Sequence, residues 1–363
     1  MVDYAIQVRP YNDTRKVIHT INEVPAAMTR NPDSLLYSLQ IGRALAALAV
    51  VAHHSALAVH SMSPEMSATL FMLLNLGHLG VDYFFVLSGF IIAHATHGMQ
   101  ATATDARAYA LSRARRIYIP YLPISVAMVV AFTCIPALSM GAREGFSLIS
   151  SLTLLPTNVP PALSVAWTLQ HELVFYGLFG LCFFGFNHPR LIYGWAAVIG
   201  IGLWINLPPW SKVIFSPINL EFLLGVVACN CYHRGRFFAH RYRLAALGLL
   251  LVATTGLLLF HGKAPTYYRL LAGLGFVCVV LGLAHMERHA QFARFSRLVF
   301  LGSASYAIYL IHGPAISLLM RILPNDTYWL LLLAIMTLLS TLAGVIYFLR
   351  IEKPLMRYFR ARA

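Results

Sequence analysis

The chain has 363 residues, of which 59% are hydrophobic and only 11% are charged, and its mean hydropathy is +0.69. Soluble domains carry about 25% charged residues, so this composition excludes an ordinary water-soluble protein and predicts one embedded in lipid. The formal net charge of +14 does not indicate nucleic-acid binding, because the Lys and Arg residues stand in short runs between apolar segments. Membrane proteins arrange their cytoplasmic loops in this way.

Long apolar segments recur along most of the chain. A transmembrane helix needs roughly 20 apolar residues, and we predict an all-α, polytopic membrane protein with about ten such helices. One membrane domain would cover residues 38–355, between a polar N-terminal segment (1–37) and a short basic tail (356–363). A shorter apolar stretch near 146–155 is predicted to be re-entrant or interfacial. The ten predicted spans are 44–62, 71–94, 117–138, 164–186, 191–207, 213–230, 244–261, 269–286, 298–320 and 328–349.

The basic residues support this number of spans. With the N-terminus in the cytoplasm, ten spans place 22 of the 27 Lys and Arg residues on the cytoplasmic side. Lys and Arg favour cytoplasmic loops, so the asymmetry predicts that both termini are cytoplasmic. The five cations on the other side are Arg143, Lys212, Lys263, Arg269 and Arg321.

Neither a signal peptide nor a disulfide framework is expected. About 37 mixed residues precede the first apolar run, and the five cysteines show no paired spacing. Cys229 and Cys231 form a C-x-C pair without nearby ligands, and His94 and His97 are predicted to lie on a solvated helix end. We therefore expect no metal site.

Several predicted spans contain ionisable residues, which are costly in lipid and indicate function. Arg43 and His54 are separated by about three helical turns, so both are predicted on one face of the first span, with Arg43 at its cytoplasmic mouth. Asp82, Glu172 and His312 follow in three other spans, each near the estimated middle of the membrane. We expect these three groups and His54 to meet in one site.

A structural role is the alternative for each ionisable group, because a buried polar side chain can simply join helices by hydrogen bonds. This alternative applies most directly to His78 and Glu221. His53 points about 100° away from His54 on a helix, so the two imidazoles cannot both face one cavity squarely. Because it is adjacent, His53 is kept as a second candidate for the role assigned to His54.

Seven short motifs occur in a fixed order along the chain. The first, LQIGRALAALAVVAHH, contains Arg43 and His54 in the pattern R-x10-H. The others are GVDYFFVLSGF (80–90), RARRIYIPY (113–121), WTLQHELVFY (167–176), NLEFLLG (219–225), SYAIYLIHGP (305–314) and EKP (352–354). This ordered set resembles the acyltransferase-3 family, with Thr168 where the family pattern has serine.

The resemblance spans residues 39–355 and implies a function. It implies a ten-helix enzyme of the bacterial inner membrane that transfers an acyl group, expected to be acetyl, from cytoplasmic acetyl-CoA to a hydroxyl of an exopolysaccharide or other surface glycan. Its expected partners are acyl-CoA, a glycan or lipid-linked saccharide acceptor, and membrane lipid, with a homo-oligomer left open. No extracellular hydrolase-like domain is expected after residue 363.

Acyl transfer to a hydroxyl needs a base for the alcohol proton and a donor for the developing oxyanion. We assign the base role to His54, with an acidic partner to orient its imidazole. Glu172 and Asp82 are both candidates for that partner. His312 is predicted to orient the acceptor sugar or to act as a second acid or base.

Coenzyme A carries several phosphate charges, so its binding site should be cationic. Arginine is suited to phosphate because its planar group donates two parallel hydrogen bonds. We therefore predict that Arg43, Arg113 and Arg116 bind the acyl donor on the cytoplasmic side. Ser88 and Gly89, with Gly80, are predicted either to let helices approach closely or to leave room for the thioester arm.

Two other functions compete with acyl transfer. A proton-coupled transporter of a saccharide or small anion would also use carboxylates and histidines in the middle of the membrane. Against it, the sequence contains no inverted repeat and no pair of broken helices. A structural partner in a polysaccharide export complex is the third hypothesis, and it leaves the buried ionisable groups without a purpose.

Overall fold

The computed structural model describes residues 36–135, 145–205, 207–263, 267–287, 292–324 and 326–361. The predicted polar segment 1–37 lies almost wholly outside these residues. The predicted basic tail (356–363) is described as far as residue 361. One compact unit begins at Tyr37 and contains the helices discussed below.

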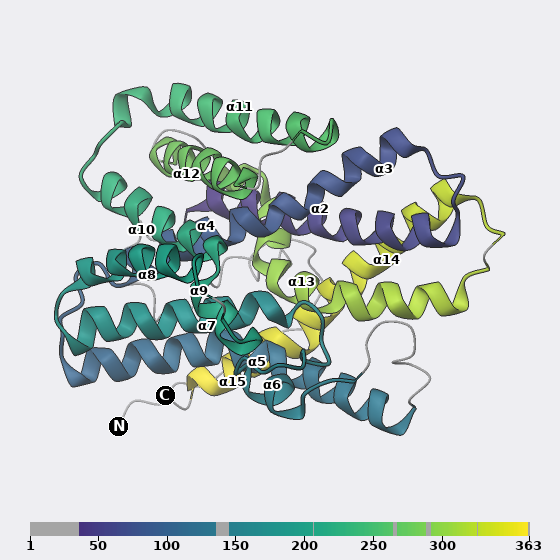
Figure 1. Ribbon diagram of the computed structural model, residues 1–363, viewed down its shortest axis with the longest axis horizontal. Coiled ribbons are helices and arrows are strands. Elements are labelled where there is room, and N and C mark those ends of the chain that lie inside the picture. The colour runs from purple at the N-terminus through teal and green to yellow at the C-terminus, as the bar shows by residue number, and fades with distance from the viewer. Residues whose placement is uncertain are drawn as a thin grey trace, which may run out of the picture. The chain divides into compact units, whose positions relative to one another are not determined.

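All regular secondary structure in these ranges is helical, which confirms the all-α prediction (Figure 1). In chain order the α-helices are α2 (Tyr37–Met62), α3 (Ala68–Asn75), α4 (Gly80–Ala95), α5 (Ala103–Cys134), α6 (Leu148–Thr153), α7 (Ala166–Gly180), α8 (Gly194–Gly202), α9 (Lys212–Phe215), α10 (Leu220–His233), α11 (Arg241–Phe260), α12 (Tyr268–Met286), α13 (Ser296–Ile322), α14 (Trp329–Tyr347) and α15 (Lys353–Ala361).

Seven helical segments of the described chain are long and apolar enough to cross a membrane. The multi-pass prediction is therefore supported, but the number of about ten is not confirmed. The predicted span 164–186 coincides with α7 and the π-helical turn Leu181–Gly185 that continues it. The predicted spans 191–207 and 213–230 overlap only the shorter helices α8 and α10, of 9 and 14 residues. Prolines at 189, 208, 209 and 217 divide this region, and proline interrupts helices because it lacks an N–H donor.

The helix α5 extends further towards its N-terminus than the predicted span 117–138. Thr102 caps it by accepting a hydrogen bond from the Asp105 backbone N–H at 3.2 Å. Arg113 and Arg116 therefore project from a rigid helix and not from a loop. Pro120 lies inside α5, and its carbonyl oxygen accepts a hydrogen bond from the Tyr347 hydroxyl at 2.7 Å.

The helices α2, α4, α5, α7 and α13 form the part of the fold that carries the candidate site. The buried face of α2 is lined with small side chains, among them Ala44, Ala47 and Val50. Gly302 of α13 lies against the backbone of α2, where a Cβ atom would overlap the Gln40 carbonyl oxygen. Small residues let membrane helices approach this closely, so α13 is held in a defined position along α2.

The stretch near 146–155, which was predicted to be re-entrant or interfacial, contains α6. Its Ser151 carbonyl accepts hydrogen bonds from Tyr121 at 2.7 Å and Ser125 at 2.5 Å, both on α5. The Ser150 hydroxyl accepts another from Gln170 of α7 at 2.8 Å. The short helix α6 thus connects α5 to α7, and these two helices lie side by side in Figure 1.

Candidate functional site

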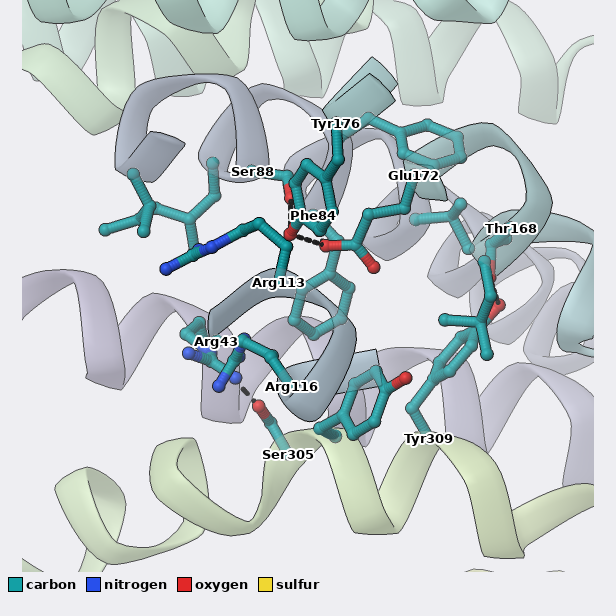
Figure 2. Close-up of a pocket in the computed structure, with 16 residues that line it drawn as sticks. Arg43, Phe84, Ser88, Arg113, Arg116, Thr168, Glu172, Tyr176, Ser305 and Tyr309 are labelled. Atoms are coloured by element: carbon teal, nitrogen blue, oxygen red, sulfur yellow. Dashed lines mark hydrogen bonds between the residues drawn. The ribbon is translucent and has the colours of Figure 1, made fainter. Parts of the chain in front are cut away.

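A cavity with about 730 Å³ of empty space, part of it open to the surroundings, lies among α2, α4, α5, α7 and α13 (Figure 2). The structure brings five of the predicted site residues to its wall: Arg43, Ser88, Arg113, Arg116 and Glu172. The remaining lining residues are Val81, Phe84, Phe85, Leu87, Ile91, Thr168, Leu169, Tyr176, Ser305, Tyr306 and Tyr309.

Three arginines from two helices face the cavity together (Figure 2). The Arg43 Nε donates to the Ser305 hydroxyl at 3.1 Å. Arg113 is only 7% exposed and lies over the Tyr176 ring at 5.8 Å, while Arg116 lies over the Tyr306 ring at 5.8 Å. Within the described residues, none of the three arginines pairs with a carboxylate within 4.0 Å. The carboxylates of Glu172 and Glu352 offset part of the arginine charge from a greater distance. Three arginines near two carboxylates leave the cavity positive for an anionic ligand.

Glu172 is the one acidic residue on the cavity wall. Its Oε1 accepts hydrogen bonds from the Ser88 hydroxyl at 2.7 Å and from the Tyr176 hydroxyl. The first bond joins α7 to α4, and the second comes from the next turn of α7. These donors fix the carboxylate at the cavity wall opposite the arginines, as Figure 2 shows.

A line of polar side chains continues from the cavity to the predicted histidines. The Thr168 hydroxyl lies 3.0 Å from the Tyr309 hydroxyl, and both residues line the cavity. The Tyr309 ring lies 5.6 Å from the ring of His312, and the His312 ring lies 4.9 Å from that of His54. The structure thus brings His54 and His312 together, one layer beyond the cavity wall.

The neighbours of His54 define its proton arrangement. Its Nδ1 lies 3.0 Å from the Val50 carbonyl oxygen, and a carbonyl can only accept a hydrogen bond. The neutral imidazole therefore carries its proton on Nδ1 and a lone pair on Nε2. The Val50 carbonyl therefore sets the tautomer without a carboxylate. Because His54 is only partly buried, its Nε2 is available to accept a proton.

His53 occupies a different environment from His54. Its ring lies 5.7 Å from His78, and its buried Nδ1 has no hydrogen-bond partner in the described structure. The side chain of His54 instead reaches α13 through His312. This arrangement favours His54 over His53 as the base.

The buried His312 stands between two cavities. Along α13, Ser305, Tyr306 and Tyr309 line the first cavity, whereas Gly313, Pro314 and Ser317 line a second of about 530 Å³. The second cavity is mainly apolar and is completed by Met128, Phe132, Gly145, Phe146, Ala162, Leu163 and Ser164. Neither ring nitrogen of His312 has a side-chain partner among the described residues, although the residue is fully buried. Its polar neighbours include the backbone of Ile308 and Tyr309 in the preceding turn and the His54 ring.

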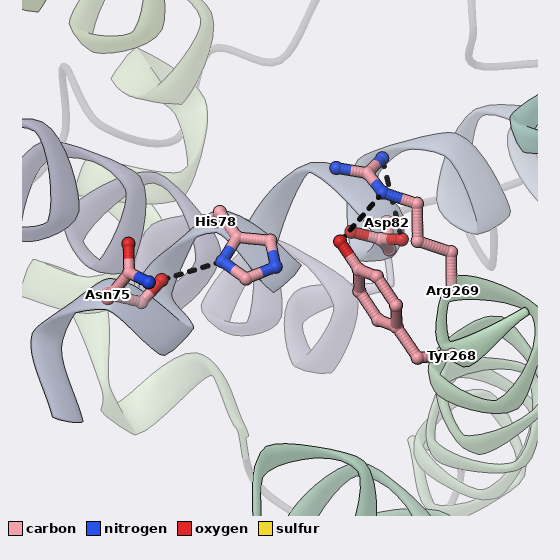
Figure 3. Close-up of polar contacts among 5 residues, drawn as sticks. All are labelled: Asn75, His78, Asp82, Tyr268 and Arg269. Carbon is pink, nitrogen blue, oxygen red and sulfur yellow. Dashed lines mark hydrogen bonds and ion pairs between the residues drawn. The ribbon is translucent and has the colours of Figure 1, made fainter. Parts of the chain in front are cut away.

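Asp82 is located away from the candidate base. Its fully buried carboxylate pairs with Arg269 of α12 at 3.8 Å, and Tyr268 and His78 lie nearby (Figure 3). Glu221 of α10, also fully buried, interacts with the same carboxylate. In the described residues no hydrogen bond joins His54 to Asp82 or to Glu172. Of the four predicted groups only Glu172 lines the cavity. His54 and His312 lie together beyond its wall, and Asp82 pairs with Arg269 instead.

For Gly89 the structure shows the first of the two predicted roles, the close approach of helices. It packs against α10, where a Cβ atom would overlap the Phe222 carbonyl oxygen, and it does not line the cavity. Ser88, the preceding residue, does line it. Sequence reasoning assigned no role to Tyr176, although its position four residues after Glu172 on one helix predicts contact between the two.

Comparisons with known proteins identify the family of the chain. Residues 36–350 match the model of the family described as "Acyltransferase domain". The exopolysaccharide production protein ExoZ of Rhizobium meliloti is 28% identical over 312 residues, which cover 79% of this chain and 92% of ExoZ. The acyltransferase MdmB of Streptomyces mycarofaciens is 24% identical over 74% of this chain and 76% of MdmB.

A third relative is larger than this chain. The peptidoglycan O-acetyltransferase OatA of Listeria monocytogenes is 26% identical over 76% of this chain, a match that spans 48% of OatA. No solved structure matches the chain significantly.

Proposed function

The chain belongs to the acyltransferase family whose model it matches over residues 36–350, and we propose that it is an O-acyltransferase of the bacterial inner membrane. It would transfer an acyl group, in the first instance acetyl, from cytoplasmic acyl-CoA to a hydroxyl of a surface glycan or exopolysaccharide. The observation that carries this proposal is the cavity with three arginines, none of them paired with a carboxylate within 4.0 Å among the described residues, at one end and the His54–His312 pair just beyond the other.

The arginine cavity is the proposed site of the acyl donor. Arg43, Arg113 and Arg116 have free donor groups, and phosphates bind such groups bidentately. Phe84, Phe85 and Ile91 line the same cavity and would contact the less polar arm of coenzyme A. In the predicted topology Arg43 lies near the cytoplasmic mouth, with His54 about 16 Å deeper along α2. An extended thioester could therefore be held by its phosphates while its acyl carbon approaches the histidines.

The proposed chemistry follows from the tautomer of His54. Its Nε2 takes the proton of the acceptor hydroxyl while the hydroxyl oxygen bonds to the thioester carbonyl carbon. The carbon–sulfur bond then breaks, and the leaving thiolate receives the proton from the imidazolium. The Thr168 hydroxyl donates its proton to the Val165 carbonyl at 2.9 Å and therefore accepts from Tyr309. The Tyr309 hydroxyl is the proposed donor to the developing oxyanion, to which it would turn from Thr168.

The second cavity is the proposed approach for the acceptor. It lies on the opposite side of His312 along α13, so donor and acceptor would enter from different ends. Its wall of Met128, Phe132 and Phe146 suits an acceptor with an apolar portion, such as a lipid-linked saccharide. The relatives ExoZ and OatA, whose names refer to exopolysaccharide production and peptidoglycan O-acetylation, support a glycan as the acceptor class. His312 would then orient the hydroxyl that reacts.

The test is transfer of label from radiolabelled acetyl-CoA by purified protein in lipid nanodiscs, with glycan and lipid-linked saccharide from a strain lacking the protein as acceptors. We expect an alkali-labile label on saccharide with wild-type protein and none with His54→Ala. Full activity of that variant would remove His54 as the base. Saccharide movement across vesicles without any acetyl transfer would instead support the transporter hypothesis.

A further inference from the structure

A cluster of metal-ligating side chains lies outside the cavity, where α4 ends beside α10. The His94 Nδ1, the His233 Nε2 and the Cys229 Sγ all lie within 4.8 Å of one another. Cys229 is 1% exposed, His94 is partly buried and His233 is exposed. Sequence reasoning predicted a solvated surface for His94 and no partners for Cys229, because their closeness depends on the packing of two helices distant in the chain.

The spacing of these atoms is close to that of a tetrahedral zinc site. The two imidazole nitrogens are 3.1 Å apart. Zinc–nitrogen bonds of about 2.0–2.1 Å and zinc–sulfur bonds of about 2.3 Å at tetrahedral angles place nitrogen atoms roughly 3.3 Å apart and nitrogen and sulfur roughly 3.6 Å apart. The two nitrogens already have this spacing. The sulfur lies within 4.8 Å of both and would reach the same cation by side-chain rotation.

The two helices hold the ligands in place before any metal binds. Cys229 and His233 are four residues apart on α10, so they share a face. Gly225, one turn earlier, lies against the Val86 carbonyl oxygen of α4, and Gly89 lies against the Phe222 carbonyl oxygen of α10. The packing of α4 against α10 continues in the same direction along both helices, from these glycines to the two histidines. There the centroids of the His94 and His233 rings are 5.0 Å apart. Rigid backbone contact thus sets the spacing of the ligands.

We propose that His94, Cys229 and His233 bind a transition-metal cation of the zinc class, with water as the fourth ligand. Two imidazoles and a thiolate form a donor set that selects zinc or a similar borderline-soft ion over magnesium or calcium. The site joins α4 to α10, and α4 also carries Ser88 to the cavity wall. The metal is a clamp between these two helices, separate from the acyl-transfer residues.

The test uses protein purified in detergent through an affinity tag that contains no histidine. Elemental analysis should find close to one zinc per chain, and titration of the metal-free protein with Co²⁺ should give a thiolate-to-cobalt charge-transfer band. Cys229→Ser should abolish the band and weaken Co²⁺ binding by more than the roughly 10- to 100-fold typical of lost outer contacts. Cys231→Ser is the matched control and should behave as wild type.

His94→Gln provides a second variant with the same expected loss of Co²⁺ affinity, in case Cys229→Ser does not fold. Elution as a monodisperse peak establishes folding for each variant. Wild-type protein that binds no stoichiometric zinc or Co²⁺ would overturn the proposal, because His94 and His233 would then share only a hydrogen bond. Equal Co²⁺ binding by Cys229→Ser and Cys231→Ser would overturn it as well.

Discussion

The Nδ1 atom of His54 lies 3.0 Å from the carbonyl oxygen of Val50, one helical turn earlier in α2. This contact gives the imidazole a defined tautomer, since the carbonyl requires a donor. The same task is often performed by a carboxylate, and neither Glu172 nor Asp82 contacts His54 within the described structure. In this protein the backbone of the helix is the group that orients the candidate base.

Replacement of His54 by alanine should remove general-base catalysis and leave donor binding intact. Such catalysis contributes about 10²- to 10⁴-fold in rate, so the turnover number should fall by at least about 100-fold while acetyl-CoA affinity stays near the wild-type value. Initial rates and binding of labelled acetyl-CoA would measure the two quantities. His53→Ala is the control and should lose less activity. An inactive His53→Ala beside an active His54→Ala would transfer the base role to His53.

Arg113→Ala should raise the KM for acetyl-CoA, because Arg113 is buried, faces the cavity and has no carboxylate partner in the described residues. A hydrogen bond to a charged group contributes about 1.5–3 kcal/mol, which corresponds to a KM increase of about 10- to 100-fold. Arg115→Ala is the matched control, since Arg115 is on the same helix but does not line the cavity. Equal effects of the two substitutions would mean that general positive charge, and not a phosphate contact, explains the arginines.

The sequence predicted much of this site because its evidence is local to single helices. The separation of Arg43 and His54 follows from helix geometry, and the motif at 113–121 contains both cavity arginines of α5. Ser88 and Glu172, from different motifs, are joined by a hydrogen bond that resemblance alone does not reveal. What could be predicted was the identity of the residues, and not their pairing.

Asp82 and Gly89 show what the sequence left open, namely where Asp82 lies and which of its two predicted roles Gly89 has. Both are in the same motif as Ser88, but a helix presents successive residues at about 100° to one another. Asp82 turns to Arg269 on α12 and Gly89 turns to α10, so only part of the motif faces the cavity. Which face of α4 meets which neighbour depends on tertiary packing. The short helices α8 and α10 differ from the predicted spans for a similar reason, because prolines divide an apolar region that hydropathy alone treats as continuous.

The hydrogen bond between Thr168 and Tyr309 should contribute to turnover at the deep end of the cavity. Thr168→Val keeps the shape of the side chain but removes the hydroxyl, and Tyr309→Phe removes the other partner. A net hydrogen bond contributes about 0.5–1.5 kcal/mol, so each substitution should lower the rate by about 2- to 12-fold. Thr168→Ser retains the hydroxyl and should be close to wild type.

The double variant Thr168→Val with Tyr309→Phe separates the pair from independent roles. If the two hydroxyls act as one unit, the rate of the double variant should resemble that of the more impaired single variant. Fully multiplicative losses would show that the residues act separately. The measurement is the acyl-transfer rate at saturating acetyl-CoA, compared among the wild type, the two single variants and the double variant.

The ion pair between Asp82 and Arg269 should support stability and not the chemical step. Its carboxylate is fully buried beside that of Glu221, so Arg269→Met would leave two buried acids without their cation. Removing one partner of a buried pair typically destabilises a protein by about 3–5 kcal/mol, and we expect a clear fall in the Tm of the protein in detergent. Adding Asp82→Asn to Arg269→Met should recover much of the lost Tm, because the uncompensated charge is removed. If Asp82 is structural, the double variant should also recover acyl-transfer activity per folded molecule. A double variant with restored Tm but no activity would instead show that Asp82 takes part in catalysis. The reaction centre would then extend beyond His54 and His312 towards α12.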